Sequence, residues 1–192
     1  CRRMMNRGIV TPRNSIIVVA LEDELPVRLV SEWTVLYTGI GKINAAIKAT
    51  EAVLQNSPSH LINFGTAGAL NTSISGLNRV NRVMQRDMDV RPLGFQLGYT
   101  PFDAINHIDL GGPGISLGTG DHFVTSEPEL TTDIVDMEAY ALAKVALLFG
   151  IKFHCWKYIS DNANKDAANQ WSENVAKGSL EFVGQVIDPL TV

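Results

Sequence analysis

The sequence predicts a single α/β domain in which buried strands alternate with helices. Residues 15–20 and 61–64 are short apolar runs, the first of them β-branched, as in strands that are buried on both faces. The runs 44–54 and 139–149 have the length and composition of helices, and 151–159 is a further apolar strand. Such alternation is typical of a sheet covered by helices.

Length and composition agree with one domain of ordinary size. The chain has 192 residues, of which 45% are hydrophobic and 19% charged, enough apolar material for a single core. A net charge of −4 gives no reason to expect a nucleic acid or an anionic membrane as partner. No stretch approaches the roughly 20 apolar residues that cross a bilayer. We therefore expect neither partner.

The cysteines and the first residues bear on the compartment. Cys155 lies in an apolar strand and Cys1 at the start of the chain, so a disulfide is not expected and a reducing, cytoplasmic compartment fits. Residues 1–13 contain four arginines but no apolar segment that would make them a secretory signal. We predict that they are a disordered tail or a remnant of protein production, and that residues 14–192 form the domain.

The first half of the chain contains glycine-rich segments after its strands. A strand at 33–37 leads into Gly39 and Gly41, and a third glycine at the spacing of a dinucleotide-binding fingerprint is absent. The strand at 61–64 continues into the small residues 65–70, which either form a tight turn or let the backbone approach a ligand closely. A Rossmann cofactor site is disfavoured.

The second half is less regular. Residues 79–100 show no clear periodicity, whereas 115–119 reads as a short strand. Residues 162–173 are predicted to be a polar loop, in which Trp171 either docks on the domain or covers a ligand. A last helix from 174 to about 187 should pack one apolar face on the sheet. That face would contain Val175, Leu180, Phe182, Val183 and Val186.

Acidic residues follow several of these elements. Asp136 and Glu138 precede the helix at 139–149, where they either cap its N-terminus or face a crevice. Asp161 follows the strand at 151–159, at the end of a strand where ligands bind in open α/β sheets. Glu24 ends an acidic run after the first strand, as a solvated helix start or as a site carboxylate. Residue spacing alone leaves both interpretations open.

Other catalytic classes are disfavoured by the pattern. The four histidines are scattered and show no metal-ligand spacing, so we expect no metal. A G-x-S-x-G nucleophile elbow is absent. Cys155 reads as a small core residue rather than a nucleophile. We expect no cofactor.

Five short motifs favour the interpretation of these acids as site carboxylates. They are Ala-Leu-Glu-Asp-Glu at 20–24, Gly-Ile-Gly-Lys at 39–42, Asn-Phe-Gly-Thr-Ala-Gly-Ala at 63–69, Gly-Asp-His-Phe-Val at 120–124, and Val-Asp-Met-Glu-Ala at 135–139 with Ile-Ser-Asp-Asn-Ala at 159–163. In this order they resemble the nucleoside phosphorylase and nucleosidase family. The 5′-methylthioadenosine/S-adenosylhomocysteine nucleosidases are the most similar members.

The resemblance implies a three-layer αβα sandwich with a central mixed sheet, and a homodimer. It implies hydrolysis of the N-glycosidic bond of adenine nucleosides that carry a 5′-thio group, without a cofactor. Asp161 would be the general acid toward the purine and Glu24 the base for water. The substrate-binding residues would be Val135, Asp136, Met137, Glu138, Ser160, Ala163, Ile40, Thr66, Ala67, Gly68, Phe123, Val124 and Trp171.

The chain also departs from the family pattern. A hairpin between Pro26 and Trp33 and a helix between Asp109 and Ile115 are expected to be missing, which shortens the rim of the pocket. Asp136 stands where the bacterial enzymes most often have Glu. Two other functions therefore stay open: a purine nucleoside phosphorylase, and a nucleoside-binding protein without catalysis.

Overall fold

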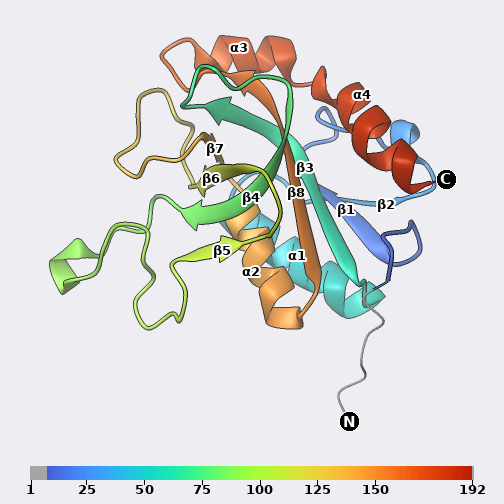
Figure 1. Cartoon of the computed structure of the whole chain (residues 1–192), viewed down its shortest axis with the longest axis horizontal. Helices are drawn as coiled ribbons and strands as arrows, with labels where there is room; N and C mark the ends of the chain where they lie inside the picture. The colour runs from blue at the N-terminus through green and yellow to red at the C-terminus, as the bar shows by residue number, and fades with distance from the viewer. Residues whose placement is uncertain (1–7, 192) are drawn as a thin grey trace.

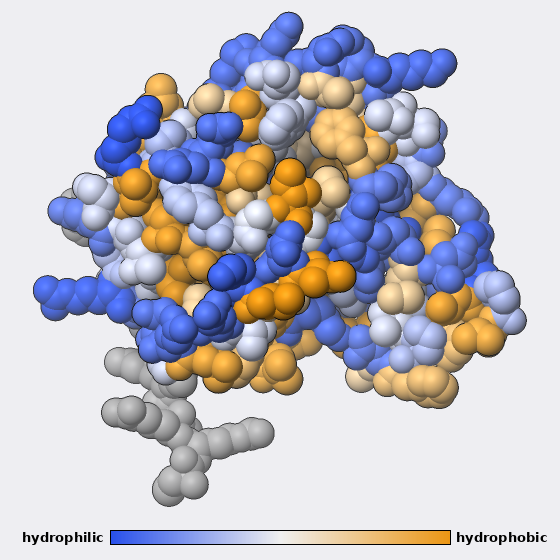
Figure 2. Space-filling model, turned by 180° about the vertical axis from the view of Figure 1, so that it is seen from behind, coloured by the Kyte–Doolittle hydropathy of each residue, from blue (hydrophilic) through white to orange (hydrophobic). Residues whose placement is uncertain are grey.

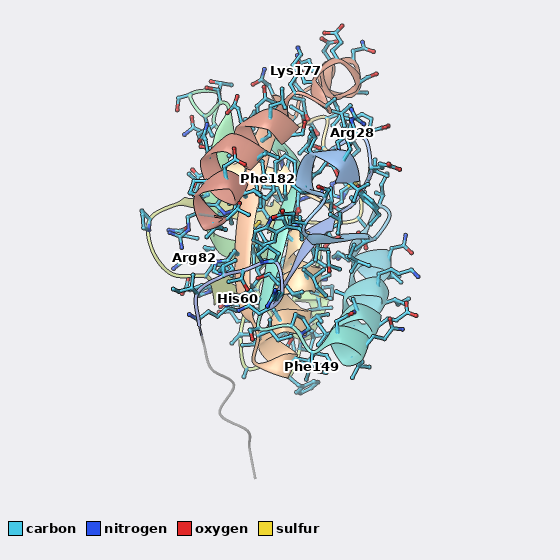
Figure 3. The ribbon with its side chains drawn as sticks, turned by 90° about the vertical axis from the view of Figure 1, so that its right-hand side faces the viewer. Arg28, His60, Arg82, Phe149, Lys177 and Phe182 are labelled. Carbon is cyan, nitrogen blue, oxygen red and sulfur yellow. The ribbon has the colours of Figure 1, made fainter. Side chains whose placement is uncertain are left out.

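The computed structural model describes residues 8–191 and has a mixed eight-stranded sheet between two layers of helices (Figure 1). Figure 3 shows the layers from the side, with α1 and α4 on opposite faces of the sheet. The predicted α/β class with a central mixed sheet is confirmed. Within residues 8–191, no helix is both long enough and apolar enough to cross a membrane.

The described chain contains eight strands and four α-helices. The strands are β1 Ser15–Val19, β2 Thr34–Tyr37, β3 His60–Ala69, β4 Leu77–Gln85, β5 His107–Asp109, β6 Ile115–Thr119, β7 Ile134–Asp136 and β8 Lys152–Asp161. The α-helices are α1 Lys42–Asn56, α2 Ala139–Phe149, α3 Ala167–Asn174 and α4 Gly178–Phe182. A π-helical turn, Val183–Ile187, continues α4. The remaining helices are short 3-10 turns at Val27–Val30, Arg91–Leu93 and Asp188–Leu190.

Part of the sheet closes on itself. β1 pairs in parallel with β2 and β3, and β3 pairs in parallel with β8. β8 then pairs with β4, β4 with β6, β6 with β7, and β7 returns to β3. The strands β3, β8, β4, β6 and β7 therefore form a closed ring, which the three-residue strand β7 completes. We refer to it below as the strand ring.

Each face of the sheet has its own core. On the α1 and α2 side, small residues such as Ala45, Ala49 and Ala143 are buried, so the two helices lie close to each other and to the strands. On the other side, Phe182 of α4 points toward the sheet (Figure 3), and its ring stacks on Phe64 of β3 with centroids 4.3 Å apart. Aromatic pairs at this separation are favourable beyond their burial.

Several boundaries differ from the sequence prediction. The helix at 139–149 has the predicted bounds, but the small residues 65–69 continue β3 instead of turning. Pairing with β8 as far as Gly68, and with β7 at Gly68 and Ala69, supplies the hydrogen bonds that hold them in a strand. The predicted polar loop 162–173 contains α3, and Trp171 lies in that helix. The prediction that Leu180 packs on the sheet is wrong, because its side chain is 69% exposed.

The shortened rim has a simple local structure. A single 3-10 turn, Val27–Val30, stands between Pro26 and Trp33, where the family resemblance implies a hairpin. A glycine-containing loop, 110–114, joins β5 to β6 without a helix. Of the tail predicted at 1–13, residues 1–7 lie outside the described part of the chain. Within the described remainder, the Gly8 carbonyl lies 3.1 Å from His60 Nε2.

Two histidines, His60 and His154, contact each other at one end of the sheet. His60 Nδ1 lies 3.1 Å from His154 Nε2, where β3 and β8 begin, and the rings are stacked. The pair needs one neutral ring to accept the proton that the other donates. Burial lowers the pKa of His154 to about 4 and lowers that of His60 below its ordinary value.

We expect acid to weaken the fold through this pair. Both folded-state pKa values lie below those of the unfolded chain, so the unfolded state binds more protons once the pH falls below about 6.5. The free energy of unfolding should therefore decrease between about pH 6.5 and 4. A His154→Phe variant, measured by urea unfolding at several pH values, should lose part of this slope. An unchanged slope would assign the acid sensitivity to other groups.

Candidate active site

A cavity of about 400 Å³ opens where several strands end. Its walls come from the ends of β1, β7 and β8, from the second half of β3, and from the segments that follow β4 and β6. Three residues of α3, Ala168, Trp171 and Ser172, cover one side. Among residues 8–191, no group of three or more His, Cys, Asp or Glu side chains could hold a metal ion.

Glu24 lies on the wall formed by β1 and β3 and is 4% exposed. Its Oε1 atom accepts hydrogen bonds from the Thr66 backbone N–H and hydroxyl, both 2.7 Å long. The Leu21 N–H donates to Oε2 at 3.2 Å. These bonds fix the carboxylate at the cavity wall. Oε1 already accepts two hydrogen bonds, whereas Oε2 accepts one and can still accept from a water or a ligand hydroxyl.

Asp161, at the end of β8, is 6% exposed and borders the same cavity. Its Oδ2 accepts from the Ser160 hydroxyl at 2.8 Å, and Oδ1 accepts from the Ala163 N–H at 2.9 Å. Burial raises the pKa of Asp161, although both hydrogen bonds favour the charged form. A carboxyl with a raised pKa can keep a proton closer to neutral pH, as a general acid must.

Asp136 and Lys157 form a buried ion pair beneath the cavity. Lys157 Nζ lies 2.9 Å from Asp136 Oδ2, and neither side chain is more than 2% exposed. Thr119 donates to Asp136 Oδ1 at 2.6 Å, and the Ala139 N–H donates to Oδ2 at 2.9 Å. Asp136 is thus both a cap of α2 and a charged partner of β8. The sequence left Asp136 as a helix cap or as a residue facing a crevice. The structure shows it in both positions, because it caps α2 and lines the cavity.

Glu138 stands at the N-cap position of α2, but its side chain makes no hydrogen bond to that helix. Its Oε1 accepts a 2.8 Å hydrogen bond from the N–H of Gly41, which stands before α1. Burial, followed by the charge of Asp136, raises the pKa of Glu138 to about 8. Lys157 acts against this shift. The raised pKa favours the protonated carboxyl, and a positive charge beside it would favour the ionised form.

Trp171 connects the α3 cover to the site carboxylates. Its Nε1–H donates to the Thr66 hydroxyl at 3.0 Å, and that hydroxyl donates to Glu24. The indole therefore borders the cavity. That it covers a bound ligand stays a prediction. Apolar side chains, one of them a flexible methionine, form other parts of the cavity wall. They come from Ile40, Phe123, Val124, Val135 and Met137.

The structure brings together all the site residues named from the sequence except one. Ala163 does not line the cavity, and it acts through its N–H bond to Asp161. The roles assigned to these residues stay predictions. The sequence reasoning did not assign several residues that line the cavity or support it. They are Ala20, Leu21, Arg86, His122, Ala168 and Ser172 on the walls and Lys157 beneath them.

Arg86 is the most notable of the residues that were not assigned. It follows β4, is 4% exposed and lines the cavity. Its NH2 group donates to the carbonyls of Gly120 and His122, and NH1 contacts the His122 ring. Its position in a segment without periodicity gave no signal. Lys157 did give one, because a lysine inside a buried strand needs a partner.

Comparisons with known proteins agree with this geometry. The family model described as the phosphorylase superfamily matches residues 28–113 and 117–187. These ranges contain most of the cavity walls. A 5′-methylthioadenosine/S-adenosylhomocysteine nucleosidase of Staphylococcus saprophyticus is 31% identical over 180 residues, covering 80% of this chain and 78% of that protein. The chain belongs to the phosphorylase superfamily, among the nucleosidases of this kind. The family resemblance seen in the sequence is confirmed.

Further comparisons extend over most of the chain. The nucleosidase of the same name from Staphylococcus haemolyticus is 29% identical over 188 residues, covering 83% of this chain and 82% of its own. A Helicobacter pylori nucleosidase structure with butyl-thio-DADMe-Immucillin-A has a TM-score of 0.81 at 22% identity, covering 91% of this chain and 97% of that one. A Colwellia psychrerythraea nucleosidase in complex with adenine has a TM-score of 0.82 at 19% identity, covering 95% and 96%. These structures share the fold of this superfamily member.

Proposed function

We propose that the protein is an N-glycosidase that hydrolyses 5′-thio-substituted adenine nucleosides, methylthioadenosine and S-adenosylhomocysteine, to adenine and the thioribose. The observation that carries the proposal is one cavity that joins Asp161, Glu24 and Glu138. The names of the most similar nucleosidases support the substrate class.

The chemistry follows from the charges that develop as the bond breaks. The departing base gains negative charge, and the ribose becomes positive in an oxocarbenium-like transition state. Asp161, with its raised pKa, donates a proton to the base. Glu24 lies on the wall near β1 and accepts a proton from the attacking water. The bond to the base breaks as the bond from water to the sugar forms.

Glu138 acts on the sugar in this mechanism. Its Oε1 is held by Gly41, which leaves the second oxygen for the ribose hydroxyls. Positive charge on the ribose lowers the pKa of Glu138 from about 8, so its ionised form becomes favoured as the transition state develops. Met137 offers an apolar contact beneath the ring.

Phosphorolysis is the closest alternative reaction. A phosphate dianion calls for free arginine forks or backbone N–H groups. Arg28 is exposed on the surface, away from the buried Glu24, whereas Arg86 borders the cavity with its NH1 and NH2 groups already engaged. The Glu24 carboxylate on the cavity wall opposes a dianion. Water carries no charge and needs only a base.

The experiment is to incubate the protein with methylthioadenosine in phosphate-free buffer and to separate the products by chromatography. We expect free adenine and the free thioribose. A rate that rises from near zero in proportion to added phosphate, with sugar 1-phosphate as product, would establish the phosphorylase instead. Binding of the nucleoside without release of adenine would establish a silent binding protein.

Glu24→Gln tests the assignment of the base. The amide keeps the size of the side chain and one acceptor for Thr66, but it cannot take a proton from water. We expect kcat to fall by about 10²–10⁴, while the affinity for methylthioadenosine changes little. Adenine release and calorimetric binding are measured on the same sample. A variant with near-normal kcat would remove Glu24 from this role.

We further propose that the protein is a homodimer, which associates through the face of α1 and α2. Large apolar side chains are exposed there, among them Ile47 at 60% and Leu148 at 78%. Figure 2, seen from the side on which α1 lies, shows apolar side chains among charged ones. A second cavity of about 760 Å³ on this face is lined mainly by apolar area, including Met88 from the segment after β4. Exposed apolar patches of this kind mark association surfaces.

Light scattering at micromolar concentration should give the mass of two chains. An Ile47→Glu and Leu148→Glu double variant should give one chain, since charges on both helices oppose burial of the patch. Leu180→Glu, on the exposed side of α4, is the matched control and should remain dimeric. A monomer mass for the unchanged protein would contradict the proposal.

A further inference from the structure

Three segments far apart in the sequence meet at one lysine beside the cavity. Lys42 Nζ lies 2.6 Å from Asp87 Oδ1, in the segment after β4, and 3.8 Å from Asp121 Oδ2, in the segment after β6. The Lys42 N–H also donates to Asp121 Oδ1 at 2.7 Å. The two acids are joined in turn, because the Asp121 N–H donates to Asp87 Oδ2 at 2.8 Å. We call these three residues the lysine latch.

The latch adjoins the groups that face the cavity. The residue before Lys42 is Gly41, whose N–H holds Glu138. The residue after Asp121 begins the run 122–124, which lines the cavity, and the residue before Asp87 is Arg86. Two successive N–H groups at the start of α1 therefore bind two carboxylates, Glu138 and Asp121. The position of one carboxylate is mechanically tied to that of the other.

The local geometry leaves little freedom around this connection. Gly41 has a φ of 96°, a conformation that favours glycine. A methyl group there would lie 3.2 Å from Asp121 Oδ1. The ammonium is needed as well, because two carboxylates lie within 3.8 Å of it and it neutralises part of their charge. Burial alone would raise the pKa of Asp87, but the hydrogen bond from Lys42 lowers it below its ordinary value. Without that cation the two acids repel.

We propose that Lys42 is a positioning residue, which acts through Gly41 and Asp121 to hold Glu138 and the 122–124 wall in the geometry that binds the ribose. This inference rests on the proposed function and names a further residue for it. Lys42 does not line the cavity, so its effect reaches the substrate only through these neighbours.

The test compares Lys42→Met with the unchanged protein on two substrates: methylthioadenosine and its 2′,3′-dideoxy analogue, which lacks the hydroxyls that Glu138 would bind. We expect kcat/KM for methylthioadenosine to fall by about 10- to 100-fold, the size of effect that a small misplacement produces. The dideoxy analogue should lose a much smaller factor, because it makes no bond that depends on Glu138. Lys42→Arg, which keeps a cation, should recover most of the loss.

Lys48→Met is the matched control. Lys48 is on the same helix and pairs with Glu51, with both side chains 52% exposed. It should behave as the unchanged protein on both substrates. Equal losses on the two substrates by Lys42→Met, or no loss beyond that of Lys48→Met, would overturn the latch proposal and leave the proposed function intact. If the unchanged protein releases no adenine, the proposed function fails. The latch is then judged by calorimetric affinity for the two nucleosides, with the same expected order.

Discussion

Asp161→Asn is expected to lower kcat for adenine release by about 10²–10⁴, the usual contribution of a general acid. The amide keeps the size of the side chain and can still accept from Ser160 or Ala163, so the fold should survive. What it lacks is the acidic proton that the departing base requires. Initial rates with methylthioadenosine, together with a thermal unfolding curve for each protein, provide the measurement.

The pH–rate profile makes this prediction specific. Burial raises the pKa of Asp161, so the protonated form is present at low pH and is lost as the pH rises through that value. The rate should therefore decline on the alkaline side. Glu138, with its pKa of about 8, also loses its proton as the pH rises. Its ionised form favours the reaction, so the variant is needed to separate this opposite effect from the loss of the acid. If Asp161→Asn keeps both a near-normal kcat and the alkaline decline, Asp161 is not the acid.

Lys157→Met is expected to lower the free energy of unfolding by about 3–5 kcal/mol, the usual cost of leaving a buried charge without its partner. The lysine is 1% exposed, and methionine matches most of its stem. Burial alone would lower the pKa of Lys157, yet Asp136, Cys155 and Glu138 together raise it above its ordinary value. The ammonium is thus fully charged in the folded protein. Urea unfolding at neutral pH measures the loss.

Matched variants separate charge from packing. If the loss comes from uncompensated acids, Lys157→Met with Asp136→Asn should recover a large part of it. The loss of the single variant should also be smaller at pH 5 than at pH 8, since protonation of a carboxyl removes the unpaired charge. Lys48→Met, at an exposed pair, should change stability by less than about 1 kcal/mol. A double variant no more stable than the single one would point to packing instead.

The sequence predicted the elements best where local pattern and tertiary burial agree. The apolar run of α2 and the β-branched run of β1 are buried, and their bounds were close to those observed. β4 was not recognised, because it carries Asn and Arg side chains between its buried valines. Its structure depends on pairing with β6 and β8, which no local pattern reports.

The same contrast between local sequence pattern and contacts between distant segments holds for the candidate site. Motifs identified the carboxylates and most of the walls, because each motif contributes a short contiguous segment. They could not identify Arg86, Lys157 or the lysine latch, whose importance comes from partners about 20 to 80 residues away along the chain. α3 was read as a loop because its exposed face is polar. Burial of Ala167 and the bond from Trp171 to Thr66 hold it in place.

The strand ring links the order of folding to the appearance of activity. Its closure requires β7 to pair with both β3 and β6, and the chain between β3 and β7 contains β4, β5 and β6. Contacts between segments so distant in sequence form slowly, since the entropy of the intervening chain is lost before they contribute. Asp136 ends β7, and Met137 and Glu138 follow it directly. The floor of the cavity is therefore assembled in the same step that closes the ring, and a refolding chain should recover helix signal before it can bind a nucleoside.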